Sequence, residues 1–211
     1  MRTAKFWMGT VLAGALALGY GCGSDAKDPI PQEAPQQYPD AGTDAGVLLT
    51  LTDAQIARIL QVANEGEVML GQYAAPLATD PAILAFNQQM VTEHTAVKQR
   101  LDALLATEGI VPEDTALSLQ LQTDIQQMMQ VLGGPNAPPP GTARDLALIS
   151  AQVAAHARVA FIGDSLLTTQ ATNTALQQEL LTERQGVQTH IDAATDLQSG
   201  LVLPPVEPVE P

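Results

Sequence analysis

The sequence predicts an all-α protein, an antiparallel four-helix bundle with a shorter connecting helix between helices two and three. Apolar residues recur with the period of an α-helix through the middle of the chain, and leucine and alanine dominate these positions. Aromatic residues make up only 3% of the chain, and strand signals are nearly absent. Turn signals separate four long periodic segments of about 25–28 residues each, and short turns favour antiparallel neighbours.

The first helix is expected to begin at Thr52, because Thr52 and Gln55 match a capping box, and to run to about Thr79. Asp80-Pro81 then supplies an N-cap and a first-turn proline for helix two. Helix two is expected to end near Gly109, since glycine commonly follows the last helical residue.

A shorter helix is predicted from about Asp114 to Leu132, closed by glycines and a proline-rich stretch at 133–140. Because this breaker separates it from the next long segment, we interpret it as a connecting or lid helix. Helix three is expected to begin near Thr142 and helix four near Asn173.

Residues 1–21 predict a secretory signal peptide, because Arg2 and Lys5 give a positive start and an apolar run follows. This run is too short for a membrane-spanning helix. The segment Gly19–Cys22 resembles a bacterial lipobox, in which the cysteine becomes the lipidated N-terminus, although leucine usually stands at the position of Gly19. The alternative is a plain signal peptide cut near Gly21 with an incidental cysteine.

The lipobox predicts a place in the bacterial cell envelope. Gly23 rather than aspartate follows Cys22, so the usual inner-membrane retention signal is missing. We therefore expect an outer-membrane lipoprotein that faces the periplasm or the surface and contacts the membrane through its N-terminal lipid. Cys22 is the only cysteine, which excludes an intrachain disulfide and a thiolate-rich metal site.

The composition of the two ends differs from that of the middle. Residues 22–50 are rich in Pro, Gly, Ala, Asp and Gln, which predicts a disordered tether after the lipidated cysteine. Residues 199–211 predict a disordered, proline-rich tail. Residues 51–198 remain as one domain, long enough for a single core. The net charge of −14 makes nucleic acid and anionic membrane surfaces poor partners.

The three histidines of the chain all fall on predicted buried stripes, each on a different helix. His94 lies on helix two, His156 on helix three and His190 on helix four, while Glu67 lies on the buried stripe of helix one. Counted from the turns, their heights agree to within about one or two helical turns. The sequence therefore predicts a cluster of imidazoles and one carboxylate in the core.

Two further residues are candidate accessory ligands. Glu183 lies two turns from His190 on the same face, and Met90 lies one turn from His94, although a methionine on a core stripe is more typical of packing. Asn64 and Glu93 are expected to face solvent or a helix edge. Neither enters the predicted site.

Burial is costly for such a polar cluster unless every group has a partner. A divalent ion held by His94, His156, His190 and Glu67 would offset that cost, and this set of nitrogen and oxygen ligands suits zinc, copper, iron or manganese. The alternative is a hydrogen-bonded polar layer, in which Glu67 forms a salt bridge with a protonated histidine.

Di-iron chemistry, phosphate binding and Ser/His/Asp catalysis are disfavoured by the sequence. Di-iron bundles use Glu-x-x-His on two helices. Here the residue three before each histidine is valine, at Val91, Val153 and Val187. No phosphate-binding loop or Ser/His/Asp spacing is found in the sequence.

Four segments on four helices resemble a known family: Glu67–Gly71, Phe86–His94, Asp145–His156 and His190–Ala194. They are similar to domain of unknown function 4142, a set of exported or outer-membrane bacterial proteins assigned to the ferritin-like superfamily. The resemblance covers about 51–197. It implies a ferritin-like four-helix fold and an exported location, and it implies no established activity.

The chain departs from the pattern of this family at three positions. Glu93 stands where aspartate is usual, Leu148 stands where an aromatic residue is usual, and Gln185 stands where proline is frequent. We expect none of these departures to affect the candidate ligands.

Three functions fit this sequence. The first is an exported, lipid-anchored bundle that binds one transition-metal ion for storage, buffering or stress protection in the envelope. The second is a non-catalytic interaction module with a hydrogen-bonded polar core. The third is a small metalloenzyme with the same ligands and an open coordination position.

Overall fold

The computed structural model describes residues 49–201, and it is all-helical over that range, as predicted. The predictions for the signal peptide 1–21, for Cys22, for nearly all of the tether and for 202–211 lie outside the described residues. The long helices are α1 (Asp53–Ala74), α2 (Pro81–Glu108), α3 (Ala116–Gly133), α4 (Thr142–Ile162) and α6 (Thr174–Gly200). The short elements are η1 (Ala75–Leu77), a π-helical turn η2 (Gly163–Leu167) and α5 (Thr168–Gln170).

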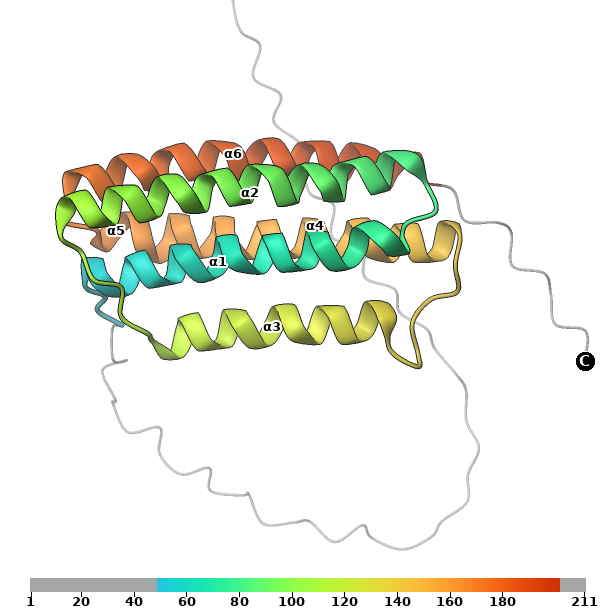
Figure 1. Ribbon diagram of the computed structural model, residues 1–211, viewed down its shortest axis with the longest axis horizontal. Helices are drawn as coiled ribbons and strands as arrows, with labels where there is room; N and C mark the ends of the chain where they lie inside the picture. Colours follow the sequence, from blue (N-terminus) through green and yellow to red (C-terminus); the bar gives the residue numbers. More distant parts are fainter. Residues whose placement is uncertain (1–48, 202–211) are drawn as a thin grey trace, which may run out of the picture. The chain divides into compact units, whose positions relative to one another are not determined.

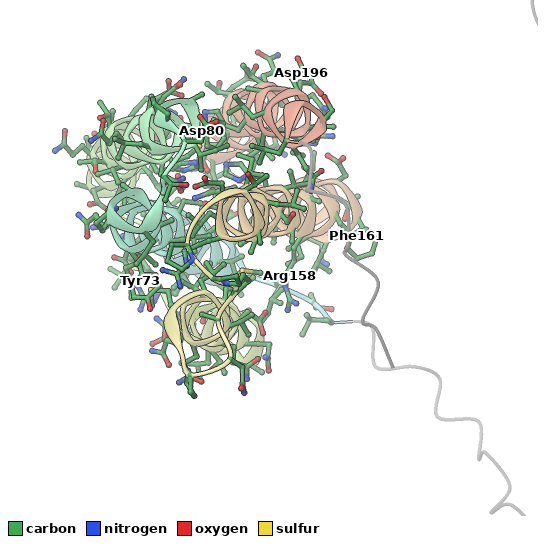
Figure 2. The ribbon with its side chains drawn as sticks, turned by 90° about the vertical axis from the view of Figure 1, so that its right-hand side faces the viewer. Tyr73, Asp80, Arg158, Phe161 and Asp196 are labelled. Carbon is green, nitrogen blue, oxygen red and sulfur yellow. The ribbon has the colours of Figure 1, made fainter. Side chains whose placement is uncertain are left out.

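Four of the long helices, α1, α2, α4 and α6, run alongside one another, and α3 lies on the outer side of α1 and α4 (Figure 1). The view along the helices shows the same arrangement (Figure 2), with the Arg158 side chain between α4 and α3. Arg158 pairs there with Asp124 at 2.7 Å. The shorter helix is therefore a fifth packed helix as well as a connection.

Close packing of α3 depends on a glycine in α1. A Cβ atom at Gly66 would lie 2.8 Å from Cγ1 of Ile125, closer than packed carbon atoms approach. Gly66 thus lets α3 approach the backbone of α1. This contact extends the core to a third layer of helices.

The predicted helix starts are confirmed in detail. Thr52 and Gln55 form both hydrogen bonds of a capping box, and the Asp80 side chain accepts a hydrogen bond from the Ala82 amide at 2.7 Å. Asn173 caps α6 in the same way. These bonds satisfy amide groups that a helix leaves free in its first turn.

Helix α1 ends at Ala74, earlier than the predicted end near Thr79. Pro76 lies in the short 3₁₀ turn that follows, and proline interrupts the α-helical hydrogen bonds. The Asp145 carboxylate of α4 accepts hydrogen bonds from the backbone amides of Thr79 and Asp80, at 2.8 and 3.1 Å. This bond network fixes the α1–α2 loop against the start of α4.

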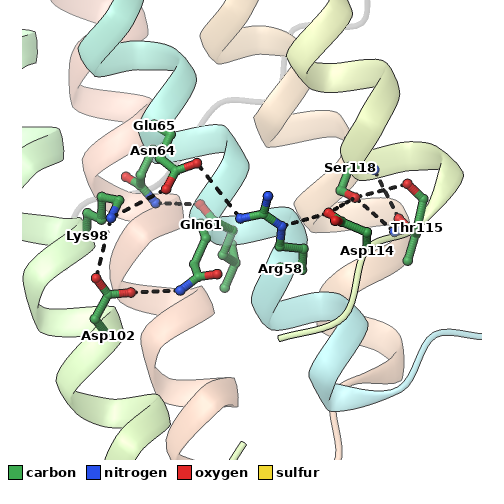
Figure 3. Close-up of polar contacts among 10 residues, drawn as sticks. Arg58, Gln61, Asn64, Glu65, Lys98, Asp102, Asp114, Thr115 and Ser118 are labelled. Carbon is green, nitrogen blue, oxygen red and sulfur yellow. Dashed lines mark hydrogen bonds and ion pairs between the residues drawn. The ribbon is translucent and has the colours of Figure 1, made fainter. Parts of the chain in front are cut away.

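Ion pairs join the outer faces of α1, α2 and the loop before α3 (Figure 3). Lys98 lies 3.4 Å from Glu65 and 3.5 Å from Asp102, and Arg58 donates to Asp114 at 2.7 Å. These groups are partly exposed. Because solvent screens them, such pairs contribute little to the stability of a protein.

The segment Thr142–Gln170 is long and apolar enough to cross a membrane by length and composition alone. A core helix passes the same test. Here Gln152 and His156 are buried against the neighbouring helices, so the segment contributes polar groups to the interior.

Two apolar clusters fill the interior of residues 49–201. The Leu101 cluster includes Ile56, Leu60, Leu101 and Leu176, and the Leu148 cluster includes Leu70, Ile83, Met90, Leu148 and Ile149. Between them lies the histidine layer, which we define as Asn64, Glu67, His94, His156 and His190.

Candidate metal centre

Three imidazole rings from three helices meet in the histidine layer. Nε2 of His156 lies 3.3 Å from Nε2 of His94 and 3.1 Å from Nδ1 of His190. One ligand atom from each of the three rings lies within 4.8 Å of the others. The rings are 1–6% exposed. The predicted convergence of the histidines is confirmed.

The outer nitrogen of each ring faces a hydrogen-bond acceptor. Nδ1 of His156 lies 2.9 Å from the Gln152 carbonyl oxygen, and Nε2 of His190 lies 2.6 Å from Oε2 of Glu93. Nδ1 of His94 lies 2.9 Å from Oδ1 of Asn64. Each of the three rings is thus oriented from outside the cluster.

The orientation of the Asn64 amide is fixed by its other contacts. Its Nδ2 donates to the Leu60 carbonyl oxygen at 2.9 Å and to Oε2 of Glu183 at 3.0 Å. A carbonyl oxygen only accepts hydrogen bonds, so the amide nitrogen must face it. The amide oxygen therefore faces His94.

These contacts decide where the protons are. A neutral imidazole carries one N–H, and each outer nitrogen must donate it to the acceptor that it faces. In the neutral form of a ring, its inner nitrogen is then unprotonated and points its lone pair at the other rings. Such an arrangement can hold a metal ion at its centre.

A proton is poorly suited to this position. Burial lowers the pKa of His94 to about 3, an effect that His156 and His190 reinforce. Burial also lowers the pKa of His156 to about 4, although the hydrogen bond to the Gln152 carbonyl opposes the shift. Both rings are therefore neutral at pH 7, the form that binds metals.

The spacing of the inner nitrogens fits a metal ion. Two nitrogens bound to one zinc ion in a tetrahedral site, with bonds of about 2.0–2.1 Å, lie roughly 3.3 Å apart. Two of the three separations, 3.3 and 3.1 Å, agree with that value, and the three ligand atoms all lie within 4.8 Å of one another. Histidine ligands also usually donate their second N–H to a carboxylate or a carbonyl oxygen, as all three do here.

Glu67 lies beside the cluster, with its side chain 4% exposed, and its Oε1 is 3.5 Å from the outer nitrogen of His156. Among the described residues its Oε2 has no hydrogen-bond partner. Burial raises the pKa of Glu67 to about 8, although the charge of His190 lowers it. The raised pKa of Glu67 and the lowered pKa of His156 both disfavour the salt bridge between them that the alternative prediction requires. Its role as a metal ligand stays a prediction.

The two accessory candidates have different positions. Glu183 lines the same cavity as the histidines and bonds to Asn64, and burial raises its pKa to about 8. Met90 is fully buried in the Leu148 cluster and is not among the residues that line this cavity. Glu183 is thus placed near the centre, and Met90 is placed in the apolar packing.

One expectation from the sequence is wrong and another is incomplete. Asn64, expected to face solvent or a helix edge, is 3% exposed and bonds to His94. Glu93, expected to be a solvated carboxylate, has a side chain that is 45% exposed, but it is also the hydrogen-bond partner of His190. Burial alone would raise the pKa of Glu93, but hydrogen bonds from His190 and Gln89 and the charge of His190 together lower it.

The departure from the family pattern at Glu93 therefore falls on a residue that contacts a candidate ligand. It conserves the carboxylate, since aspartate is usual there.

Helical spacing also indicated that Asn64 is buried, because Asn64 lies four residues after the buried Leu60. Gln152, four residues before His156 on the same face, gave the same kind of signal.

The fold and the site define a helical protein with a buried cluster of three histidines. The chain belongs to the family described as domain of unknown function (DUF4142), whose sequence pattern matches residues 39–197. No curated protein and no solved structure matches it.

Proposed function

We propose that this chain is an exported, lipid-anchored protein with a ferritin-like four-helix bundle that binds one transition-metal ion in its core. Its use is metal storage, buffering or stress protection in the envelope. The observation that carries this proposal is the inward convergence of three buried imidazole nitrogens, from His94, His156 and His190.

The types of ligand narrow the choice of metal ion. Three imidazole nitrogens suit zinc, copper or iron, and manganese is a weaker match because it prefers oxygen ligands. The three histidines are the minimal ligand set. Glu67 is the candidate fourth ligand, since it has a free buried oxygen and lines the same cavity.

Export and lipidation are supported by the sequence of residues 1–22. Labelling of the expressed protein with a radioactive fatty acid tests them, with Cys22→Ser as the unlabelled control. Label that persists in the Cys22→Ser variant would contradict the proposed anchor.

A second candidate is an envelope interaction module with a polar core. It is favoured by one observation: the inner nitrogens lie at hydrogen-bonding distances, so one proton shared among them would also satisfy the layer. This candidate predicts a melting temperature that does not change with chelator.

Metal analysis of protein purified without a histidine tag tests the leading proposal. Wild-type protein is expected to retain about one ion per chain after dialysis, and the His94→Ala/His156→Ala double variant is expected to retain none. Met90→Leu is the matched control, because it changes a buried side chain of α2 with little change in volume. Equal metal content in wild type and the double variant would remove the proposal.

A further inference from the structure

The three histidines form one wall of a cavity of about 210 Å³. Helices α1, α2, α4 and α6 all contribute to its lining. Arg100 and Thr182, which are exposed, also line it, so the cavity extends from the buried cluster to the surface. A cavity of about 150 Å³ accepts a molecule of the size of benzene, so this one has room for a small organic ligand.

The cavity is lined by three carboxyl side chains from three different helices: Glu67 from α1, Glu93 from α2 and Glu183 from α6. Arg100 is the only lysine or arginine among the described residues that line it. The charge of Arg100 is already paired, because its guanidinium donates to both carboxylate oxygens of the buried Glu179, with a shortest distance of 2.7 Å. The lining therefore holds acidic groups without a matching positive group.

Two of these carboxyl groups each have an oxygen without a partner. Oε2 of Glu67 and Oε1 of Glu183 are buried and have no hydrogen-bond partner within 49–201. The other oxygen of each group is engaged: Oε1 of Glu67 lies 3.5 Å from Nδ1 of His156, and Oε2 of Glu183 accepts from Asn64 at 3.0 Å. A buried acceptor without a donor is costly, so the two free oxygens point to a ligand that brings donors into the cavity.

We propose that this cavity binds a small primary alkylammonium ion, which donates N–H groups to the free oxygens of Glu183 and Glu67. Its hydrocarbon chain lies against the apolar part of the wall, which consists of Ala63, Val97, Val159 and Val187. This inference goes beyond the proposed function and does not depend on it. If a metal ion takes Glu67 as its fourth ligand, the free oxygen of Glu183 remains for the ammonium group.

The free oxygens also select the kind of cation. A guanidinium group matches a carboxylate through both oxygens, whereas Glu67 and Glu183 offer one free oxygen each. A primary ammonium group is a compact charge with three separate donors, so it suits single oxygens. A quaternary ammonium group has no N–H to donate. The positive charge of the ligand in turn favours the ionised form of Glu183.

The size of the cavity and its apolar wall favour an organic cation over a second metal ion. The four apolar side chains of the wall offer no atom that ligates a metal, and a single ion would leave most of the 210 Å³ unfilled. A short hydrocarbon chain fills this space and loses apolar surface to the wall, which is favourable.

Gly186 offers a way to fill the cavity without altering a carboxyl group. It lines the cavity, and a Cβ atom there would meet no described atom within 4 Å beyond its own helix. Leucine at this position is compatible with helix α6, because it favours helix more than glycine does. Gly200, in the same helix, also has an open Cβ position and lies outside the cavity lining, so Gly200→Leu is the matched control.

Glu183→Gln tests the charge of the anchor, because it keeps the shape of the side chain and removes the carboxylate. Glu65→Gln is its matched control. Glu65 is a half-exposed carboxylate that pairs with Lys98 and does not line the cavity, so this variant makes the same change in net charge outside the site.

The experiment titrates the full chain with n-butylammonium by isothermal titration calorimetry, with a metal chelator present. Wild-type, Gly200→Leu and Glu65→Gln proteins are expected to bind one n-butylammonium ion with the same Kd. The Kd is expected to rise by about tenfold or more in Gly186→Leu and in Glu183→Gln. Wild-type protein is expected to bind 1-butanol, which has the same chain without the charge, at least about tenfold more weakly, and butyrate more weakly still.

Several results would overturn the inference. Wild-type protein that does not bind n-butylammonium, or that binds 1-butanol equally well, would show that the cavity does not select a cation. Equal Kd values in either variant and its control would place the ion elsewhere on this acidic protein. Because chelator is present throughout, none of these results bears on the proposed metal ion, which metal analysis tests separately.

Discussion

The histidine layer lies on four of the helices that also carry the two apolar clusters, yet the layer and the clusters contribute to the protein in opposite ways. Leu101 and Leu148 are fully buried among other apolar side chains, and each such residue stabilises the fold by about 1.5–3 kcal/mol. The histidine layer is also buried, but it contains Glu67 and three imidazoles, whose burial has a cost in solvation.

The apolar clusters stabilise the fold, whereas the histidine layer carries the proposed binding site. The apolar clusters on either side hold the backbone in place, and the layer between them presents oriented nitrogens. The proposed metal ion would offset the solvation cost of this layer.

The largest expected effect falls on stability and comes from the Leu148 cluster. Leu148→Ala is expected to reduce the free energy of unfolding by about 2–5 kcal/mol, through lost burial and the cavity left behind. Urea unfolding with and without metal measures it. The affinity for Zn²⁺ should change little. A loss of affinity comparable to that of a histidine variant would contradict the assignment of stability to the apolar clusters and of metal binding to the histidine layer.

The next effect falls on metal binding. His156→Ala removes the ring whose Nε2 contacts both other histidines. It is expected to weaken Zn²⁺ binding by more than about 100-fold, because loss of a residue that only hydrogen-bonds to a metal ligand already costs about 10–100-fold. A competition titration with a chromophoric chelator measures the Kd. An unchanged Kd would place the metal elsewhere.

A smaller effect is expected for the outer partner of His190. Glu93→Gln should weaken Zn²⁺ binding by about 10–100-fold, because the amide accepts the N–H of His190 less strongly than a carboxylate does. Glu65→Gln is the control, since Glu65 is a half-exposed carboxylate that pairs with Lys98. The same loss in both variants would indicate a general effect of charge.

The last effect concerns pH. The folded pKa of Glu67 is about 8 and its ordinary value is 4.5, so between these values the folded state holds a proton that the unfolded state releases. Its contribution to stability is present below pH 4.5 and is lost as the pH rises through 8, at about 1.4 kcal/mol per pH unit. His94 and His156, with folded pKa values of about 3 and 4, have the opposite sign and act below pH 6.5.

Between pH 6.5 and 8, metal-free protein should therefore lose stability, and Glu67→Gln should reduce that loss. Urea unfolding of both proteins in chelator at several pH values gives the comparison. Parallel curves for wild type and Glu67→Gln would show that Glu67 does not hold a proton in the folded state.

The features of the molecule that depend on neighbouring residues in the chain could be predicted from the sequence. The capping box at Thr52, the Asp80-Pro81 start and the buried stripes that carry His94, His156 and His190 follow from residue spacing, and all are confirmed. The early end of α1 also had a local cause, Pro76, which the apolar period concealed.

The features that could not be predicted from the sequence depend on contacts between helices. Glu93 lies beside His94 in sequence, about a quarter of a turn round the helix, and only the position of α6 shows that it reaches His190. The packing of α3 on Gly66 likewise depends on which helices become neighbours. Periodicity identifies a buried face, but it does not identify the partner across it.

The most direct test of the account is X-ray absorption at the zinc edge on tag-free protein carrying one Zn²⁺ per chain. The account predicts three imidazole nitrogens at about 2.0–2.1 Å from the ion. A spectrum with oxygen neighbours alone, or one identical in the His94→Ala/His156→Ala variant, would contradict it.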